Sequence, residues 1–179
     1  MNHLNDPPRQ RFLWQTWISL LAAAVPMLSG CSTPLVIDRA IGPDPFSVSN
    51  AAAHGELQVF TMKQEENNVG FEFPFYQRTA YSIYTPDGRH IKDISDNNCG
   101  HFDDTPPVIS LAPGAYSIRG FMAEDLGQFT VLSVVIERGR KTEVHLDGHW
   151  QSPGHVSQNQ LVRAPNGFLL GWPARSPSN

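Results

Sequence analysis

The stretch "ISLAPGAYSIRGF", residues 109–121, decides the fold class of this chain. On both sides of Pro113-Gly114, apolar side chains alternate with small or polar ones, which is the two-residue period of a β-strand. Proline fixes the φ angle of a turn and glycine accepts positive φ, so the pair can reverse the chain. The stretch therefore predicts two short strands joined by a hairpin turn.

The same pattern recurs along the chain. "TAYSIYTPDGRHIKDI" (79–94) has two extended runs around Pro86-Asp87-Gly88, and "FTVLSVVIERGRKTEVHLDG" (129–148) has two more, with a turn at 138–140. "QLVRAPNGFLLGW" (160–172) has the form of an additional C-terminal hairpin, with Trp150, Phe168 and Trp172 expected to fill one end of the fold. Together with "ELQVFTM", the strands are expected at 57–62, 79–85, 89–94, 108–111, 115–122, 129–137 and 142–147.

Seven short strands separated by turns, with no helical stripe after residue 30, predict an all-β protein. The specific expectation is a seven-stranded antiparallel β-sandwich. The alternation of apolar and polar residues along these strands predicts which side chains face the core: Val59, Tyr81, Ile83, Ile109, Leu111, Tyr116, Ile118, Val131, Val135, Val144 and Leu146.

The segment from Leu111 to Tyr116 resembles the Leu-x-Pro-Gly-x-Tyr segment of carboxypeptidase-regulatory-like domains, which are transthyretin-like (prealbumin-like) Greek-key sandwiches. The resemblance covers residues 56–147. It implies that Leu111 packs inside, that Pro113 and Gly114 turn the chain, and that the Tyr116 hydroxyl bonds to nearby backbone. Family members are mostly non-catalytic modules of envelope and secreted proteins. The enzymatic branch, which hydrolyses 5-hydroxyisourate, ends in Tyr-Arg-Gly-Ser, whereas this chain ends in "WPARSPSN".

The first thirty residues are arranged like a secretory signal. Arg9 and Arg11 precede the apolar run "FLWQTWISLLAAAVPML" (12–28), and small residues follow it. "LSGC" (28–31) resembles the lipobox of bacterial lipoproteins, which implies cleavage between Gly30 and Cys31. It also implies a diacylglyceryl group on the Cys31 thiol and a fatty acid such as palmitate on the new amino group of Cys31. Ser32 then favours the outer membrane, facing the periplasm, in a host with two membranes. An uncleaved anchor helix is the alternative, since roughly 20 apolar residues span a bilayer.

These readings divide the chain into a signal peptide (1–30), a flexible tether (31–55), the sandwich (56–147) and a C-terminal hairpin and tail (148–179). The tether is expected from its prolines and its lack of period, although "LVI" at 35–37 can also pair as an edge strand. Thirteen basic residues against seventeen acidic ones, without a basic cluster, argue against a nucleic-acid partner.

Two groups of polar residues can carry metal chemistry. "DISDNNCGHFDDTPP" (93–107) brings Cys99, His101, Asp103 and Asp104 close together in sequence, and such thiolate, imidazole and carboxylate groups suit zinc or calcium. The alternative is a polar surface loop in which Cys99 is a free thiol or forms an intermolecular disulfide. His145, His149 and His155 form the second group, although Asp147-Gly148 is expected to end the strand between the first two.

"GFEFPFY" (70–76) places Phe71, Phe73 and Phe75 on one face if the segment is extended. Such a stripe is either a contact surface for an envelope protein or a glycan, or a set of residues that pack under a loop. No nucleophile elbow, phosphate loop or His-Glu-x-x-His motif occurs in the chain, so no enzyme is expected. The leading expectation is a lipid-anchored binding or scaffolding protein of the cell envelope without a cofactor. A metal-dependent protein and a glycan-binding module are the alternatives.

Overall fold

The computed structural model describes residues 33–47, 49–66, 75–95, 97–98, 105–123 and 129–175. The chain divides into two compact units, Met1–Cys31 and Ser32–Asn179, and all described residues belong to the second. In this part of the chain the regular structure is β, apart from a 3-10 turn at Gln158–Gln160, and no α-helix is present. None of the described residues belongs to a helix long and apolar enough to cross a membrane.

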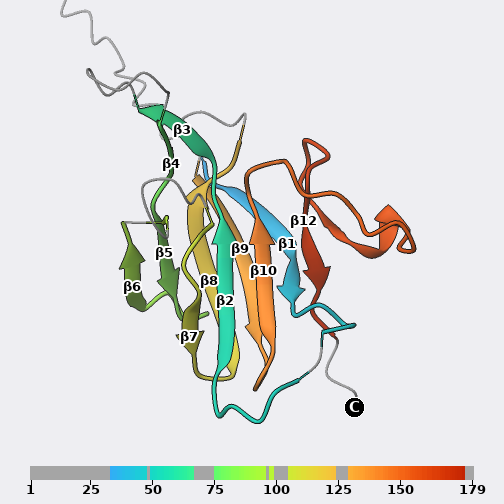
Figure 1. Ribbon diagram of the computed structural model, residues 1–179. Helices are drawn as coiled ribbons and strands as arrows, with labels where there is room; N and C mark the ends of the chain where they lie inside the picture. Colours follow the sequence, from blue (N-terminus) through green and yellow to red (C-terminus); the bar gives the residue numbers. More distant parts are fainter. Residues whose placement is uncertain are drawn as a thin grey trace, which may run out of the picture. The chain divides into compact units, whose positions relative to one another are not determined.

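Ten of the strands form two sheets that lie one in front of the other in Figure 1. The larger sheet has the order β11 (Val162–Arg163), β12 (Leu169–Pro173), β1 (Leu35–Gly42), β9 (Phe129–Ile136), β8 (Gly114–Phe121), β5 (Tyr81–Tyr84), β6 (His90–Ile94). The smaller sheet has the order β10 (Lys141–His145), β2 (Gly55–Phe60), β7 (Ile109–Leu111). A separate two-stranded ribbon consists of β3 (Lys63–Glu66) and β4 (Phe75–Arg78). The expected all-β class is confirmed, and each of the seven expected strands is present with ends shifted by at most two residues.

The expectation of purely antiparallel sheets is wrong. β1 runs parallel to β9, and β10 runs parallel to β2, so both sheets are mixed. The hairpins expected at 109–121 and 129–148 are also wrong, because β7 and β8 belong to different sheets, as do β9 and β10. The hairpins β5–β6 and β11–β12 are confirmed. A tight turn reverses the chain equally well within one sheet or between two, so turn residues alone do not identify the partner strand.

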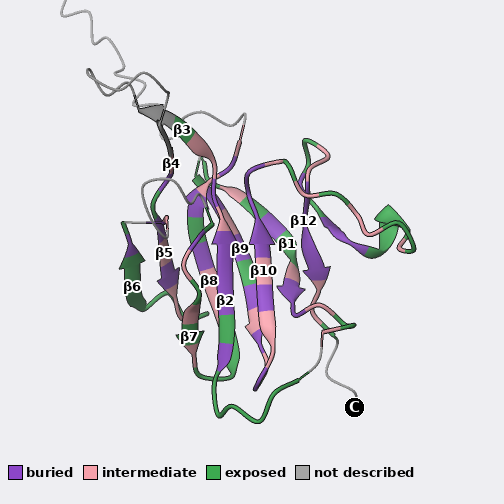
Figure 2. Cartoon of the chain, in the orientation of Figure 1, coloured by how far each residue is buried: buried purple, intermediate pink, exposed green. Residues whose placement is uncertain are grey.

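One hydrophobic core lies between the two sheets. In the larger sheet, Ile37, Leu132, Ile118 and Ile83 form a cross-strand row of buried side chains. Buried residues of β2 and β10, including Leu57 and Val144, belong to the same cluster, and Figure 2 shows this burial along the facing strands.

Six of the expected core residues are buried, and Ile109, Leu111 and Tyr116 pack against the core while partly exposed. The expectation for β9 is wrong: Leu132, Val134 and Ile136 are buried, whereas Val131 and Val135 are only half-buried. "FTVLSVVI" is apolar at nearly every position, so its own pattern does not distinguish its two faces. Pairing with β8 decides the facing residues, because Ile118 and Leu132 are register partners.

The prediction of a flexible tether at 31–55 is wrong for residues 35–42, which form β1. β1 is an interior strand of the larger sheet, between β12 and β9, and not the edge strand considered as the alternative. Its side chains Ile37 and Ile41 are 6% and 0% exposed, which explains why the segment is ordered into the sheet. The C-terminal hairpin joins the same sheet through β12, where Trp172 packs with Leu161 and Leu169 in a second cluster.

Candidate functional site

Most residues that the sequence singled out for chemistry lie outside the described part of the chain. These are Gly30 and Cys31 of the lipobox, Cys99, His101, Asp103 and Asp104 of the polar loop, and Phe71 and Phe73 of the aromatic run. Phe75 is the first residue of β4, and its side chain is not described. The lipidation, metal and contact-surface expectations for these residues therefore stay predictions.

The residues of the fold motif are described. The Tyr116 hydroxyl donates a hydrogen bond to the carbonyl oxygen of Ala112, 2.8 Å away, which is the type of bond that the family resemblance implies. Leu111 is half-buried at the end of β7, and Pro113 precedes the first residue of β8, Gly114. The chain changes sheet at this turn, so the tyrosine bond closes a connection between the two layers.

The three histidines of the second group do not converge. β10 ends at His145, and Gly148 has a φ of 71°, so the chain turns away before His149 as the sequence predicted. His145 is buried, whereas His149 and His155 are exposed. His155 lies edge-on to Phe46, with ring centroids 5.3 Å apart. No group of three His, Cys, Asp or Glu side chains within the described ranges is arranged to hold a metal ion.

A buried charged cluster at one end of the core joins the segments that the sequence singled out. Arg78, at the end of β4, donates from Nη1 to the Thr61 carbonyl oxygen (2.8 Å) and to Asp147 Oδ2 (3.2 Å). The Arg78 and Asp147 side chains are only 4% and 7% exposed. Asn97 is fully buried and donates from Nδ2 to the Val59 carbonyl oxygen and to Thr61 Oγ1. We call Thr61, Arg78, Asn97 and Asp147 the Arg78 cluster.

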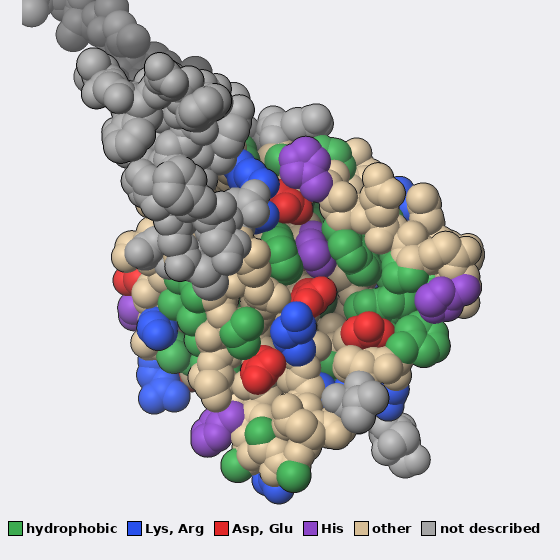
Figure 3. Space-filling view, in the orientation of Figure 1, with side chains coloured by type: hydrophobic (Ala, Val, Ile, Leu, Met, Phe, Trp, Pro, Cys, Tyr) green, Lys and Arg blue, Asp and Glu red, His purple; other side chains and the backbone are tan. Residues whose placement is uncertain are grey.

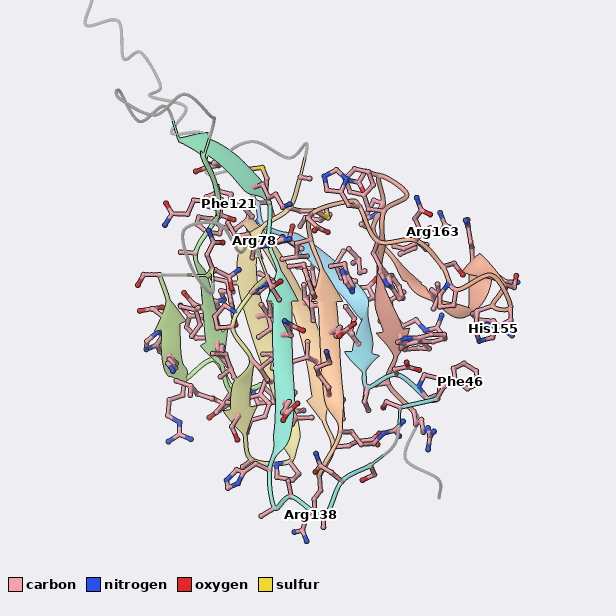
Figure 4. All side chains as sticks on the ribbon, viewed as in Figure 1. Phe46, Arg78, Phe121, Arg138, His155 and Arg163 are labelled. Atoms are coloured by element: carbon pink, nitrogen blue, oxygen red, sulfur yellow. The ribbon has the colours of Figure 1, made fainter. Side chains whose placement is uncertain are left out.

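The Arg78 cluster ties together three chain segments that are far apart in sequence. The backbone N–H of Arg78 donates to Asn98 Oδ1 at 3.2 Å, which fixes β4 to the beginning of the polar loop. β4 itself continues from the aromatic run, and Asp147 follows the exit of β10. Figure 4 shows Arg78 beside the upper end of β2, at the opposite end of the domain from Arg138.

A stack of rings extends from this cluster over the outer side of the smaller sheet. The Arg78 guanidinium lies 5.1 Å from the Phe60 ring centroid. Phe60 stacks on His145 at 4.5 Å, and His145 stacks on Trp150 at 4.8 Å with the two planes 2° apart. Figure 3 shows hydrophobic, histidine and charged side chains gathered on this face, over β2 and β10. The stack fixes the segment after β10 against the sheet by burying ring surface.

Glu143 is the charged neighbour of this stack. Its carboxylate lies 3.8 Å from His145 Nε2 and 2.5 Å from Lys141 Nζ. His145 first, and then Lys141, lower the pKa of Glu143 from 4.5 to about 2, while partial burial acts in the opposite direction. A carboxylate with this pKa stays ionised throughout the physiological range.

The Glu143→Gln variant is expected to show the consequence for acid stability. Because folding lowers the pKa of Glu143, its stabilising contribution is present above pH 4.5 and is lost as the pH falls towards 2. The side chain is 35% exposed, so solvent screening reduces the contribution to about 1 kcal/mol. Urea unfolding at pH 6.5 and pH 2 measures it: wild type is more stable than Glu143→Gln at pH 6.5, and the two are alike at pH 2. An equal difference at both values contradicts this prediction.

Several buried polar atoms near the same end of the core have no hydrogen-bond partner within the described part of the chain. They include Thr79 Oγ1, Tyr81 Oη, Asn97 Oδ1 and Thr130 Oγ1. Tyr81 and Thr130 are the register partners of Gly120 on its two sides, so their side chains face the core in one row. Burial raises the pKa of Tyr81 above its ordinary value. A polar atom buried without a partner typically costs about 1–3 kcal/mol.

The Tyr81→Phe variant is therefore expected to be as stable as wild type or more stable by about 1 kcal/mol, because it removes a buried hydroxyl that has no hydrogen-bond partner among the described residues. The matched control is Tyr116→Phe, which loses the bond to the Ala112 carbonyl oxygen and is expected to be destabilised by about 1 kcal/mol. Thermal unfolding followed by circular dichroism measures both. A Tyr81→Phe variant that is less stable than Tyr116→Phe overturns the prediction.

The site consists of a buried ion pair and a buried amide that hold chain segments together, and of a stack of rings on the outer side of the smaller sheet. The donors of Arg78 and Asn97 bond to Thr61, Asp147 and the Val59 carbonyl oxygen, so the cluster connects chain segments inside the protein. Sequence reasoning missed Arg78, Asn97 and Asp147. The available signals were an arginine directly before an apolar strand and an aspartate directly after one.

Comparison with protein-family models, curated proteins and solved structures finds no match to this chain. The described domain is thus defined as a mixed two-layer β-protein with a buried charged cluster at one end.

Proposed function

We propose that this protein is a lipid-anchored protein of the cell envelope that binds a protein partner and has no catalytic activity. In this proposal Cys31 carries the lipid, and the domain is a prealbumin-like Greek-key β-sandwich. The outer membrane, facing the periplasm, is its location in a host with two membranes. The lipobox "LSGC" supports the anchor. The change of sheet at Pro113-Gly114, with its Tyr116 bond, supports the fold family.

The observation that carries the binding role is the convergence at Arg78. The Arg78 guanidinium bonds Thr61, after β2, and Asp147, after β10, and the Arg78 backbone N–H bonds Asn98 of the polar loop, so three chain segments are held at one residue. Loops placed on a rigid scaffold are where binding residues concentrate. His149 is exposed directly beyond Asp147 and marks the surface of this end.

The first experiment addresses the binding end in the full-length protein within its own membranes. A photo-crosslinking amino acid replaces His149 in one variant and Arg138, exposed at the opposite end of the domain, in the matched control. We expect a discrete adduct from position 149 and none from position 138, with the partner identified by mass spectrometry. Adducts of equal yield at both positions, or none at position 149, contradict the proposed binding end.

The anchor is tested separately with Cys31→Ala. This variant is expected to remain as a precursor without lipid, whereas the wild-type protein is expected to begin at Cys31 and to carry the added mass of a diacylglyceryl group and one further fatty acid. Mass spectrometry of the protein extracted from membranes measures both. A wild-type protein that retains residues 1–30 and carries no lipid refutes the lipoprotein assignment.

A further inference from the structure

A second surface feature lies on the outer face of the larger sheet, on the side away from the core. Here residues of β3, β5, β6, β8 and β9 line a shallow, solvent-open hollow of about 380 Å³. Its lining includes Gln64, Ser82, Asp93, Arg119, Phe121 and Phe129. Figure 4 shows Phe121 at the upper end of the sheet. None of these residues belongs to the Arg78 cluster.

Among the described residues that line this hollow, the charged side chains are one acidic and one basic residue, Asp93 and Arg119. Ser82 is the register partner of Arg119 on one side and of Asp93 on the other, so a basic, a neutral and an acidic residue lie side by side on three strands. The Arg119 guanidinium lies 4.2 Å from the Tyr84 ring centroid, and this contact holds it against the sheet. His90 Nε2 lies 2.9 Å from Asp93 Oδ1. The Ser82 hydroxyl and His90 lower the pKa of Asp93, so it remains an acceptor at neutral pH.

An apolar platform adjoins the charged row. Phe121 and Phe129 are register partners with ring centroids 4.1 Å apart and planes tilted by 33°. Phe129 is 50% exposed, although burial of such a ring is normally favourable. Exposed aromatic surface beside fixed polar groups is typical of a ligand site.

We infer that this hollow binds a neutral glycan. A sugar ring has an apolar face of C–H groups, which fits the Phe121–Phe129 platform. Its hydroxyl groups both donate and accept hydrogen bonds, which matches an arginine that only donates and a carboxylate that only accepts. An anionic ligand pairs with Arg119 but is repelled by Asp93. A cationic ligand pairs with Asp93 but is repelled by Arg119. The balanced charge of the site therefore favours an uncharged polyhydroxyl ligand.

The test uses the full-length protein in detergent micelles and a panel of neutral oligosaccharides: maltohexaose, cellohexaose and chitohexaose. A hyaluronan hexasaccharide is the anionic comparison. Isothermal titration measures binding to the wild type and to Phe129→Ala, Arg119→Ala and Asp93→Asn. Val36→Ala is the matched control, because Val36 is an exposed apolar residue of the same face that does not line this hollow. Circular dichroism verifies that each variant is folded.

We expect the wild type to bind at least one neutral oligosaccharide, with affinity reduced at least about tenfold in each of the three hollow variants. Val36→Ala should bind like wild type. The inference is overturned by a lack of binding to all three neutral probes at millimolar concentration, by a preference for hyaluronan, or by binding that the hollow variants do not change. Crosslinking at position 149 is independent of this outcome, so the two proposals fail separately.

Discussion

Replacing Asp147 with alanine is expected to lower the free energy of unfolding by about 3–5 kcal/mol, because it leaves a buried guanidinium without this carboxylate. The pair is 3.2 Å apart, and both side chains are less than a tenth exposed. The loss should therefore appear as a large drop in the urea midpoint with an unchanged slope.

Two controls separate ion-pair loss from other effects. His90→Ala breaks an exposed pair, with side chains 48% and 65% exposed, and should cost less than about 1 kcal/mol. The double variant Arg78→Met with Asp147→Leu removes both charges and should be less destabilised than Asp147→Ala, since a buried pair is often replaceable by apolar side chains. If the free energy of unfolding of Asp147→Ala lies within about 1 kcal/mol of the wild-type value, the Arg78–Asp147 pair is not desolvated as proposed.

The second large effect is expected for Gly139→Ala, at about 3 kcal/mol, from strained backbone and steric overlap together. Gly139 has a φ of 66°, in the turn between β9 and β10. A Cβ atom at this position meets the carbonyl oxygen of Asn50 at 2.0 Å. The neighbouring backbone cannot easily retreat, because the Asn50 N–H donates to the Gly139 carbonyl oxygen and the Gly139 N–H donates to the His54 carbonyl oxygen, both at 2.9 Å.

Gly88→Ala is the matched control for this prediction. Gly88 also has a positive φ, 87°, but apart from its two chain neighbours no atom of the described residues lies within 4 Å of the position of a Cβ atom. The Gly88→Ala substitution should lower the free energy of unfolding by the backbone strain alone, about 1–2 kcal/mol. Urea unfolding of both variants measures the difference that the contact with Asn50 adds. If the two variants lose equal stability, the close approach of residues 50 and 139 is not a constraint in the folded protein.

The candidate site could be predicted only in outline. The sequence identified the polar loop and the strand exit at Asp147-Gly148 as unusual segments, because their composition is locally distinctive. It did not indicate that they meet at Arg78. Thr61 and Asp147, the partners of the Arg78 guanidinium, lie 17 and 69 residues away along the chain. A contact over that separation produces no repeating pattern in the sequence. The outer hollow was missed for a related reason: Arg119, Ser82 and Asp93 become neighbours only when β8, β5 and β6 pair.

What the sequence determined by itself is local: the period of two and the turn residues located seven strands and the hairpins β5–β6 and β11–β12. Tertiary structure alone decided which strands pair. It placed β1 inside the larger sheet, made two pairs parallel and sent the turns at Pro113-Gly114 and Gly139 from one sheet to the other. It also selected the buried face of β9, whose side chains are apolar on both faces. The physical reason is that backbone preference acts over a few residues, whereas the choice of partner depends on burying all the apolar faces together in one core.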